Sequence, residues 1–311
     1  MKLTDPIYTD ENKAREHLES LHWPHGPNCP HCGNANPDRI TKLQGKSTRP
    51  GVYKCKECRK PFSVTVGTLM ERSHIKINVW LAAMHLLTSS KKGMSAHQMH
   101  RMLGITYESA WFLCHRLREA MRDEPKSSGP LGGKNKVVEA DEAYVGGKAK
   151  NRAHREPAPK KAVLSLVERD GRVASFHVAN VTAATVRPII VTTADRASAL
   201  MTDESGIYPR LGREYASHGT VNHSANEYAR LGGFMHINTA ENFFSILKRG
   251  INGVYHQVSE AHLHRYLAEF DYRYNNRIGL GVTDTERCER AIKGMVGKRL
   301  TYRRTNEAGH A

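Results

Sequence analysis

Cysteines near the start of this 311-residue chain are the first residues whose spacing suggests chemistry. Four of them form two C-x2-C pairs separated by 22 residues, and the pairs are Cys29 with Cys32 and Cys55 with Cys58. Four thiolates at this spacing are typical of structural Zn2+, which prefers soft ligands and a closed tetrahedral shell. Short strands expected at 52–54 and 61–64 flank the second pair. We therefore predict a zinc ribbon over residues 20–66.

The zinc ligand set has alternatives nearby. His22, His25 and His31 lie close to the cysteine pairs and could each replace a thiolate. A redox-active pair is the other interpretation of one C-x2-C unit, but the second unit favours zinc. The remaining cysteines, Cys114 and Cys288, fall in a helical and a charged pattern. We expect each of them to be a single reduced thiol.

Three carboxylates in the second half of the chain form the other candidate site. Asp141 lies within an apolar strand, and Asp203 ends an apolar strand expected at 199–203. Glu241 lies on an amphipathic helix expected at 238–250. Most acidic residues are solvated, but carboxylates placed in or beside apolar elements are candidate ligands. Two aspartates and a glutamate could hold two Mg2+ ions, which prefer oxygen ligands and catalyse phosphoryl transfer on DNA.

The elements around these carboxylates indicate a fold. After the strand of Asp141, strands are expected at 162–167 and 173–178, joined by a hairpin turn. A helix at 183–193 follows, and then the strand that ends in the second aspartate. This β-β-β-α-β order is how an RNase H-like fold begins. We predict an α/β protein whose RNase H-like catalytic core spans 134–280, preceded by the zinc ribbon and a helical module.

The positive charge is concentrated at the front of the chain. Lys and Arg number 47 against 31 Asp and Glu, which gives a net charge of +16. The first 136 residues alone hold 22 basic and 12 acidic residues. A generally solvated basic surface is one interpretation. A nucleic-acid-binding front attached to a nearly neutral core is the sharper one.

A helix-turn-helix-like module is expected at 70–126. Apolar spacing predicts a helix at 78–88, Ser95 can cap a second helix, and Thr106 can cap a third. Two helices joined by a short glycine-containing turn are typical of DNA-binding modules, although small helical bundles share the pattern. The basic side chains expected on exposed faces are His97, His100, Arg101, Arg116 and Arg118. We predict Arg101 and Arg116 as DNA contacts.

Three later segments complete the expected organisation. Residues 127–133 have the Ser, Gly and Pro composition of a linker, which places a domain boundary there. A helix is expected at 260–277, and its arginines are either solvated or in contact with phosphates. Residues 281–311 are expected to be a basic C-terminal tail that frays or contacts DNA nonspecifically.

Several stretches of the chain resemble the DDE transposases of bacterial insertion sequences, in the ISXO-like group with an N-terminal zinc ribbon. The resemblance covers roughly residues 20–280 and is most specific in the last 50 of these. The matching stretches are 138–148, 202–203, 236–250, 253–259 and 262–277.

The resemblance implies roles for individual residues. Asp141, Asp203 and Glu241 would be the metal-binding triad, with two catalytic Mg2+ ions. Lys248 would be the basic residue that follows the third acid; it lies seven residues after Glu241, nearly two turns or about 10 Å along the helix. Members of this group vary at the third ligand, so Asn238, one turn before Glu241, is the alternative. We favour Glu241, because a carboxylate is the better Mg2+ ligand.

The resemblance also implies partners. These are double-stranded DNA, as terminal inverted repeats and as target, and further copies of the chain assembled on that DNA. Arg249 and His256 are further candidate DNA contacts, although a core or capping histidine is the common alternative for His256.

The predicted function is metal-dependent cleavage at the ends of an insertion sequence and strand transfer into target DNA. The alternatives are a noncatalytic DNA-binding protein derived from a transposase and a stand-alone RNase H-like nuclease. The chain has no run of 18 apolar residues, so no membrane span is expected. The N-terminus lacks the apolar stretch of a secretory signal. We expect a cytoplasmic, nucleoid-associated protein.

Overall fold

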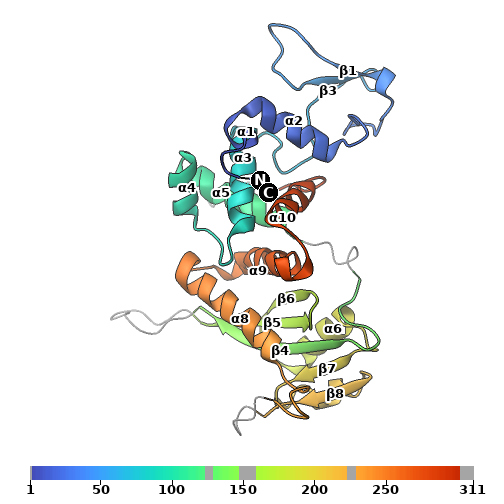
Figure 1. The fold of residues 1–311 in the computed structure, drawn as a ribbon, viewed down its shortest axis with the longest axis vertical. Helices are drawn as coiled ribbons and strands as arrows, with labels where there is room; N and C mark the ends of the chain where they lie inside the picture. Colours follow the sequence, from blue (N-terminus) through green and yellow to red (C-terminus); the bar gives the residue numbers. More distant parts are fainter. Residues whose placement is uncertain (1, 123–128, 147–158, 223–228, 302–311) are drawn as a thin grey trace, which may run out of the picture. The chain divides into compact units, whose positions relative to one another are not determined.

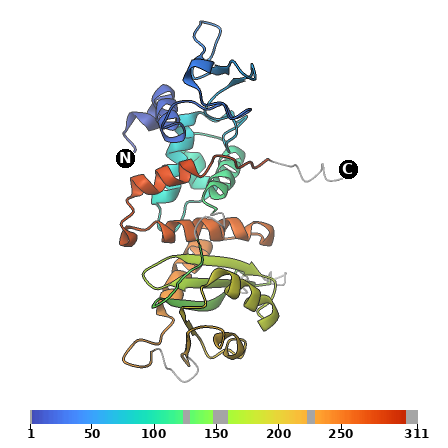
Figure 2. The same cartoon turned by 90° about the vertical axis from the view of Figure 1, so that its right-hand side faces the viewer.

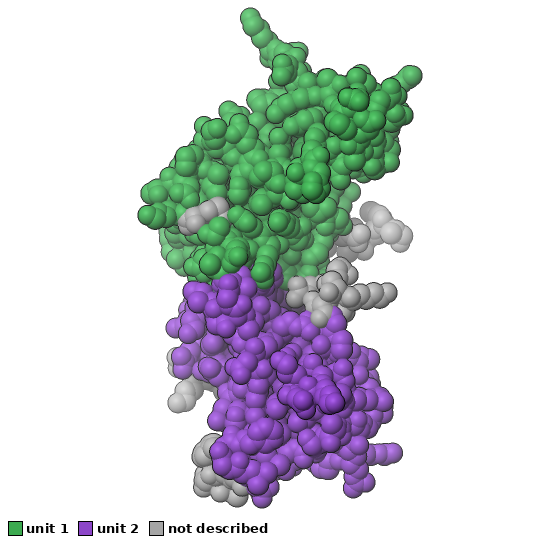
Figure 3. Space-filling view, turned by 45° about the vertical axis from the view of Figure 1, so that its right-hand side comes forward, with its two compact units in different colours: residues 1–90, 94–122, 283–311 green, residues 91–93, 123–282 purple. Residues whose placement is uncertain are grey.

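A computed structural model describes residues 2–122, 129–146, 159–222 and 229–301 of the chain. These residues form two compact units (Figure 3). The first unit combines residues 1–90, 94–122 and 283–311, and the second combines 91–93 and 123–282. No helix among the described residues is long and apolar enough to cross a membrane.

The ribbon in the first unit is a small antiparallel sheet of three strands in the order β1-β2-β3 (Figure 1). The strands are β1 (Ile40–Lys42), β2 (Tyr53–Cys55) and β3 (Pro61–Phe62), and a 3-10 turn, η1 (Pro37–Arg39), precedes them. Trp23 packs edge-on against Tyr53, with 5.3 Å between ring centroids. The two strands predicted around the second cysteine pair are therefore confirmed to within a few residues.

Two helices precede the ribbon, α1 (Pro6–Thr9) and α2 (Glu11–His22), and the sequence analysis did not predict them. The Asp10 side chain caps α2 by accepting hydrogen bonds from the N–H groups of Asn12 and Lys13. The Tyr53 hydroxyl donates to Glu19 at 2.9 Å, which ties α2 to the ribbon.

The helical module contains the three helices that the sequence predicted. They are α3 (Ile77–Ser89), α4 (Ala96–Leu103) and α5 (Tyr107–Ala120). Ser95 caps α4 by accepting from the N–H of Gln98, and Thr106 caps α5 by accepting from the N–H of Ser109. Gly104 ends α4 with a φ of 64°, a left-handed conformation that glycine adopts without strain.

The expectation of a basic tail over 281–311 is wrong for the part that the structure describes. Residues Asp284–Lys293 form helix α10, which packs against α3 (Figure 2). Ile292 on α10 is 1% exposed. The Lys298 ammonium donates to the carbonyls of Glu119, Ala120 and Arg122, where a cation stabilises the C-terminal end of α5. Apolar spacing within this charged segment made it core rather than tail.

The second unit is built on a mixed five-stranded sheet with the order β6-β5-β4-β7-β8. The strands are β4 (Val137–Val145), β5 (Lys161–Glu168), β6 (Val173–Val178), β7 (Ala199–Thr202) and β8 (Ser217–Thr220). Pairing is antiparallel between β4 and β5 and between β5 and β6, and parallel between β4 and β7 and between β7 and β8. The predicted β-β-β-α-β order is confirmed.

Helices cover both faces of this sheet. Alternate residues of β4 divide between the two faces: Ala143 packs with α8 and α9, whereas Ala140 packs with α6 and α7. The helical elements are α6 (Ala183–Thr193), α7 (Pro209–Gly212), α8 (Asn238–Gly250), the π-helical turn η3 (Ile251–Tyr255), α9 (Glu260–Asn275) and the 3-10 turn η4 (Ile278–Leu280). The predicted bounds of α6 and α8 are confirmed.

The edge strand β6 is protected by α9. The Asn275 side chain accepts from the Val173 N–H at 2.7 Å and donates to the Val173 carbonyl at 3.0 Å. The Asp271 carboxylate accepts from the N–H and the hydroxyl of Ser175. These side chains satisfy backbone groups that an open edge would leave unpaired.

The predicted linker at 127–133 lies partly outside the described residues, which resume at 129. Leu131 belongs to the second unit, because its N–H and carbonyl bond with Thr193 and Asp195. Gly132 has a φ of 82°, and a Cβ there would lie 2.1 Å from the Ser198 hydroxyl. The end of the expected linker is therefore packed structure.

Candidate zinc and carboxylate sites

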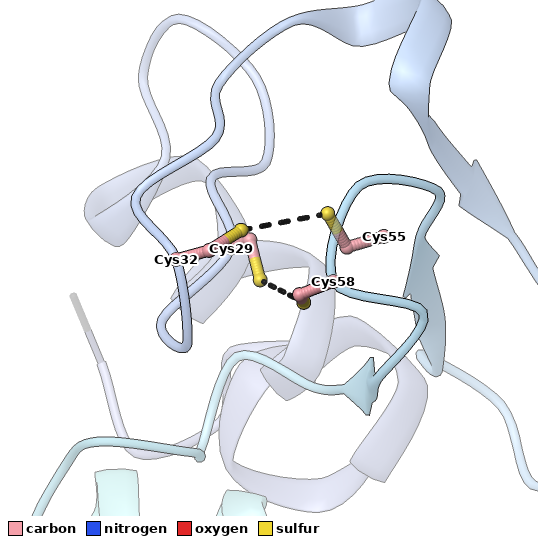
Figure 4. Close-up of side chains that lie close together, drawn as sticks. All are labelled: Cys29, Cys32, Cys55 and Cys58. Atoms are coloured by element: carbon pink, nitrogen blue, oxygen red, sulfur yellow. Dashed lines mark hydrogen bonds between the residues drawn. The ribbon is translucent and has the colours of Figure 1, made fainter.

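The four predicted cysteines lie together in the ribbon, as Figure 4 shows. The distance between the sulfurs of Cys29 and Cys58 is 3.6 Å, and that between the sulfurs of Cys32 and Cys55 is 3.7 Å. A tetrahedral site with Zn–S bonds of about 2.3 Å requires sulfurs about 3.8 Å apart. All four cysteines are free thiols. The cluster therefore fits a structural zinc ion.

Hydrogen bonds lower the pKa of one thiol in the cluster, which favours the thiolate form that binds a cation. The backbone N–H of Cys58 and the side chain of Asn34 lower the pKa of the Cys55 thiol to about 6, against the effect of burial. Two of the alternative histidines contact backbone carbonyls instead: His22 lies 3.2 Å from the Ile292 oxygen and His31 lies 3.4 Å from the Pro61 oxygen. Within the described part of the chain, the four cysteines are the only cluster of three or more Cys, His, Asp or Glu side chains close enough to share one metal ion.

The other two cysteines are buried single thiols outside the zinc-ribbon cluster. Burial raises the pKa of Cys288 to about 12, so this thiol is unreactive at neutral pH. Cys114 is 1% exposed on α5.

The predicted carboxylates come from three separate elements of the second unit. Asp141 lies in the middle of β4, Asp203 directly follows β7, and Glu241 lies in the first turn of α8. The parallel register pairs Glu139 with Met201, so extending it by two residues brings Asp203 level with Asp141. Asp141 has the same parity on β4 as Ala143, which packs against α8.

The charges of these carboxylates act on one another. Burial raises the pKa of Asp141 to about 7, against the hydrogen bond from the Glu142 N–H. The negative charges of Glu142, Asp203 and Glu241 contribute in the same direction as burial. A half-buried carboxyl surrounded by other carboxylates fits a site whose charge a divalent cation would balance.

Glu142 points to the other face of the sheet, as strand geometry predicts. Its carboxylate accepts a hydrogen bond from Tyr208, a fully buried residue of the core beneath α6 and α7. Burial raises the pKa of Glu142, and the Asp203 charge adds to this effect. The alternative third ligand, Asn238, is exposed at the start of α8, one turn before the equally exposed Glu241.

One functional candidate was missed in the sequence. Glu139, two residues before Asp141 on β4, is 0% exposed. Its carboxylate accepts from Arg169 at 2.6 Å, the Thr239 hydroxyl at 3.0 Å and the Ala240 N–H at 2.9 Å. A third acid on the strand that carries Asp141 and Glu142 was the available signal, but its partners lie 30 to 101 residues away.

The predicted DNA contacts differ in exposure. Arg101 on α4 is exposed, and so are Lys248 and Arg249 in the last turn of α8. His256 is also exposed and has a φ of 59° at the end of the π-helical turn η3.

The expectation that Arg116 and Arg118 lie on exposed faces is wrong. The Arg116 guanidinium stacks over Phe112, 4.4 Å from the ring centroid, and donates to the Leu300 carbonyl. Burial lowers its pKa. Arg118 is 2% exposed. Leu300 and helix α10 pack on this side of the helical module, and the local helical pattern could not indicate these distant contacts.

Comparison with known proteins matches two parts of the chain. A family model described as a transposase zinc-ribbon domain matches residues 9–61. A second, described as an ISXO2-like transposase domain, matches residues 130–275. The chain therefore contains an ISXO2-like transposase domain and a transposase zinc-ribbon domain. Among curated proteins, the chain is 26% identical over 289 residues to an uncharacterized protein in transposable element ISH50 of Halobacterium salinarum, covering 86% of this chain and 91% of that protein.

The matched ranges of the chain correspond to the two candidate sites. The zinc-ribbon match ends three residues after Cys58 and includes all four cysteines. The transposase-domain match includes Asp141, Asp203 and Glu241. Part of the stretch at 138–148 that resembles the family, residues 147–148, lies outside the described residues.

Proposed function

We propose that this chain is a transposase that cuts DNA at the ends of its insertion sequence and joins the freed ends to target DNA, using metal ions held by Asp141, Asp203 and Glu241. The observation that carries the proposal is electrostatic. Burial raises the pKa of Asp141 in the sheet, and the charges of two acids from distant elements, Asp203 and Glu241, act in the same direction. The strand order β6-β5-β4-β7-β8 supports an RNase H-like core around them.

The donor set suits Mg2+, a hard cation that takes carboxylate oxygens and keeps several waters. Two such ions would activate the attacking oxygen and stabilise the leaving 3′-oxygen of the DNA. Asp141 is the central ligand in this proposal, because both other acids act on it.

Basic residues would hold the DNA. Lys248 is exposed on α8, about 10 Å along the helix axis from Glu241, and we propose that it contacts a neighbouring phosphate of the same strand. Arg249 beside it, His256 and Arg101 are further proposed contacts. We also propose that the transposase assembles as a homo-oligomer on double-stranded DNA and acts in the cytoplasm at the nucleoid, where its DNA substrate is located.

The test is strand transfer from a DNA fragment that carries one end of the insertion sequence. We expect Asp141→Asn, Asp203→Asn and Glu241→Gln each to lower transfer by several orders of magnitude, because each removes an anionic ligand while keeping side-chain shape. DNA binding in a gel-shift assay should be retained. Lys248→Ala should weaken engagement of the DNA end and leave residual chemistry.

Asn238→Ala is the control for the third ligand. If Asn238→Ala is inactive and Glu241→Gln is active, the mechanism stands with the other residue as ligand. If all three acidic variants transfer DNA like the wild type, the carboxylate site is not catalytic. A wild-type chain that binds DNA ends but never cuts or joins them would be a DNA-binding protein rather than an active transposase, and a chain that cuts without joining would be a nuclease.

A further inference from the structure

The strand β4 and the helix α8 are connected by a buried carboxylate that has no role in the cation site proposed above. Glu139 is 0% exposed and lies two residues before Asp141, so both side chains leave the same face of the strand. The Glu139 carboxylate accepts a hydrogen bond from the N–H of Ala240, and Ala240 directly precedes Glu241. Glu139 therefore lies two residues from one proposed ligand and contacts the residue next to the other, so it joins their two elements in space.

Three donors surround the Glu139 carboxylate. Arg169 donates at 2.6 Å, the Ala240 N–H at 2.9 Å and the Thr239 hydroxyl at 3.0 Å. His236 Nδ1 lies 3.1 Å from the same carboxylate. Both carboxylate oxygens are engaged, so Glu139 itself is poorly suited to ligate a cation.

Arg169 extends this connection to the chain that leads into α8. Its guanidinium donates to the Phe234 carbonyl at 2.7 Å and to the His236 carbonyl at 2.8 Å, in addition to Glu139. The Arg169 backbone N–H also donates to the Val137 carbonyl at the start of β4. A planar guanidinium can make these bonds in fixed directions at the same time, whereas an ammonium cannot.

The cap residue of helix α8, Ile237, makes no side-chain hydrogen bond, and the preceding His236 ring accepts only from the N–H of Asn238, at 3.3 Å. The N–H groups of a first turn need an acceptor, and an anion is favoured there by the helix dipole. The Glu139 carboxylate, on the neighbouring strand, serves as both the acceptor and the anion. The start of α8 is thus held at a fixed place over β4.

We infer that Glu139 and Arg169 are positioning residues that set the distance between Asp141 and Glu241. The inference rests on the proposed function, in which these two acids are ligands of the same metal site. Glu139 and Arg169 touch neither the DNA nor the metal ions in this proposal. They act by fixing the first turn of α8 relative to β4.

The test compares Glu139→Gln and Arg169→Lys with the wild type. Gln keeps the shape of Glu139 but presents an NH2 group to the surrounding donors. Lys keeps the charge of Arg169 but loses the planar guanidinium that donates in several fixed directions. Two measurements are made: amide hydrogen exchange of residues 240–242 in Mg2+-free protein, and Mn2+ affinity by electron paramagnetic resonance. Loss of supporting contacts around metal ligands costs about 10- to 100-fold in metal affinity. We expect Mn2+ affinity to fall by that factor and exchange at 240–242 to rise at least about tenfold.

A metal titration separates positioning from catalysis. High Mn2+ should restore strand transfer to Glu139→Gln, because its ligands are intact but misplaced, and should not restore it to Asp141→Asn. Glu214→Gln is the matched control. The Glu214 carboxylate accepts hydrogen bonds from Arg187 at 2.7 and 2.9 Å, and this pair lies away from α8. It should change neither measurement.

The inference is overturned if Glu139→Gln and Arg169→Lys keep wild-type exchange at 240–242 and wild-type Mn2+ affinity. It is also overturned if both variants lose protection equally at 240–242 and in β5, since the pair would then only stabilise the unit. If Glu139→Gln alone fails to fold, the result for Arg169→Lys decides. Failure of the proposed function gives a different pattern, in which Asp141→Asn binds Mn2+ and transfers DNA like the wild type.

Discussion

Asp141 should make the Mg2+-free protein less stable as the pH rises, and Asp141→Asn should remove this dependence. The folded carboxyl has a pKa of about 7 because of burial, with further contributions from the charges of Glu142, Asp203 and Glu241. In the unfolded chain the same carboxyl ionises at its ordinary pKa of 3.8. Between these values the unfolded chain has released a proton that the folded chain still holds.

The sign and size of the pH dependence of stability follow from this difference in bound protons. The folded state binds more protons, so the free energy of unfolding falls by about 1.4 kcal/mol for each pH unit and levels off above pH 7. From pH 5 to pH 8 the contribution of Asp141 is a loss of about 3 kcal/mol. The Asn variant lacks the titrating group. Its stability relative to the wild type should therefore rise by about 3 kcal/mol over this range, which is about 100-fold in the unfolding equilibrium.

Hydrogen exchange at the amides of β5 is the suitable assay. All three tryptophans, Trp23, Trp80 and Trp111, lie in the first unit, so their fluorescence does not report on the sheet. Comparing Asp141→Asn with the wild type at each pH cancels the intrinsic exchange rate. Adding Mg2+ at pH 8 should stabilise the wild type and not the variant, because a cation favours the ionised carboxylate.

Asp170→Asn, an exposed change in the turn between β5 and β6, is the control and should show no such trend. A ratio of exchange rates between Asp141→Asn and wild type that stays constant from pH 5 to pH 8 would refute the reasoning. Asp141 would then titrate like an ordinary carboxyl, and the electrostatic basis for a cation site at β4 would be lost.

Three further predictions concern the first unit. Elemental analysis should find one zinc per chain in the wild type and almost none in Cys55→Ser. The ribbon of the variant should unfold, because a structural zinc contributes about 10 kcal/mol or more to folding. Wild-type protein that is purified without chelator and contains no zinc would contradict this prediction. Arg101→Ala should weaken DNA binding and reduce the slope of log affinity against log salt by about 1, whereas Arg116→Ala should mainly destabilise the first unit. Equal slopes for Arg101→Ala and the wild type would show that Arg101 makes no phosphate contact. Ile292→Ala should cost about 2–5 kcal/mol of stability, read by tryptophan fluorescence in denaturant; an unchanged midpoint would mean that α10 is not part of the core.

The position of α10 changes how the DNA-binding part should be isolated. The first unit combines residues 1–90 and 94–122 with the segment from 283 onward. A fragment that ends at residue 126 would leave the face of α3 that packs against α10 without its partner. Tests of DNA binding are therefore best made on the full chain.

The sequence alone determined the features that depend on local pattern. The spacing of the cysteine pairs specified a four-thiolate site, because metal ligands in a ribbon lie on two tight turns that are each encoded by a few neighbouring residues. The caps at Ser95 and Thr106 marked two helix starts, since a cap hydrogen bond reaches only two or three residues along the chain. Alternation along β4 likewise assigned Asp141 and Glu142 to opposite faces of the sheet.

Only the tertiary structure decided how these local pieces meet. Arg116 was predicted on an exposed helix face and residues 281–311 as a basic tail, yet Arg116 and Lys298 each bond to a residue more than 170 positions away along the chain. Glu139 could not be distinguished from a solvated acid until Arg169 and the start of α8 were placed around it. Burial and the charges of distant residues, which no local pattern records, set the pKa of Asp141 and the roles proposed for its neighbours.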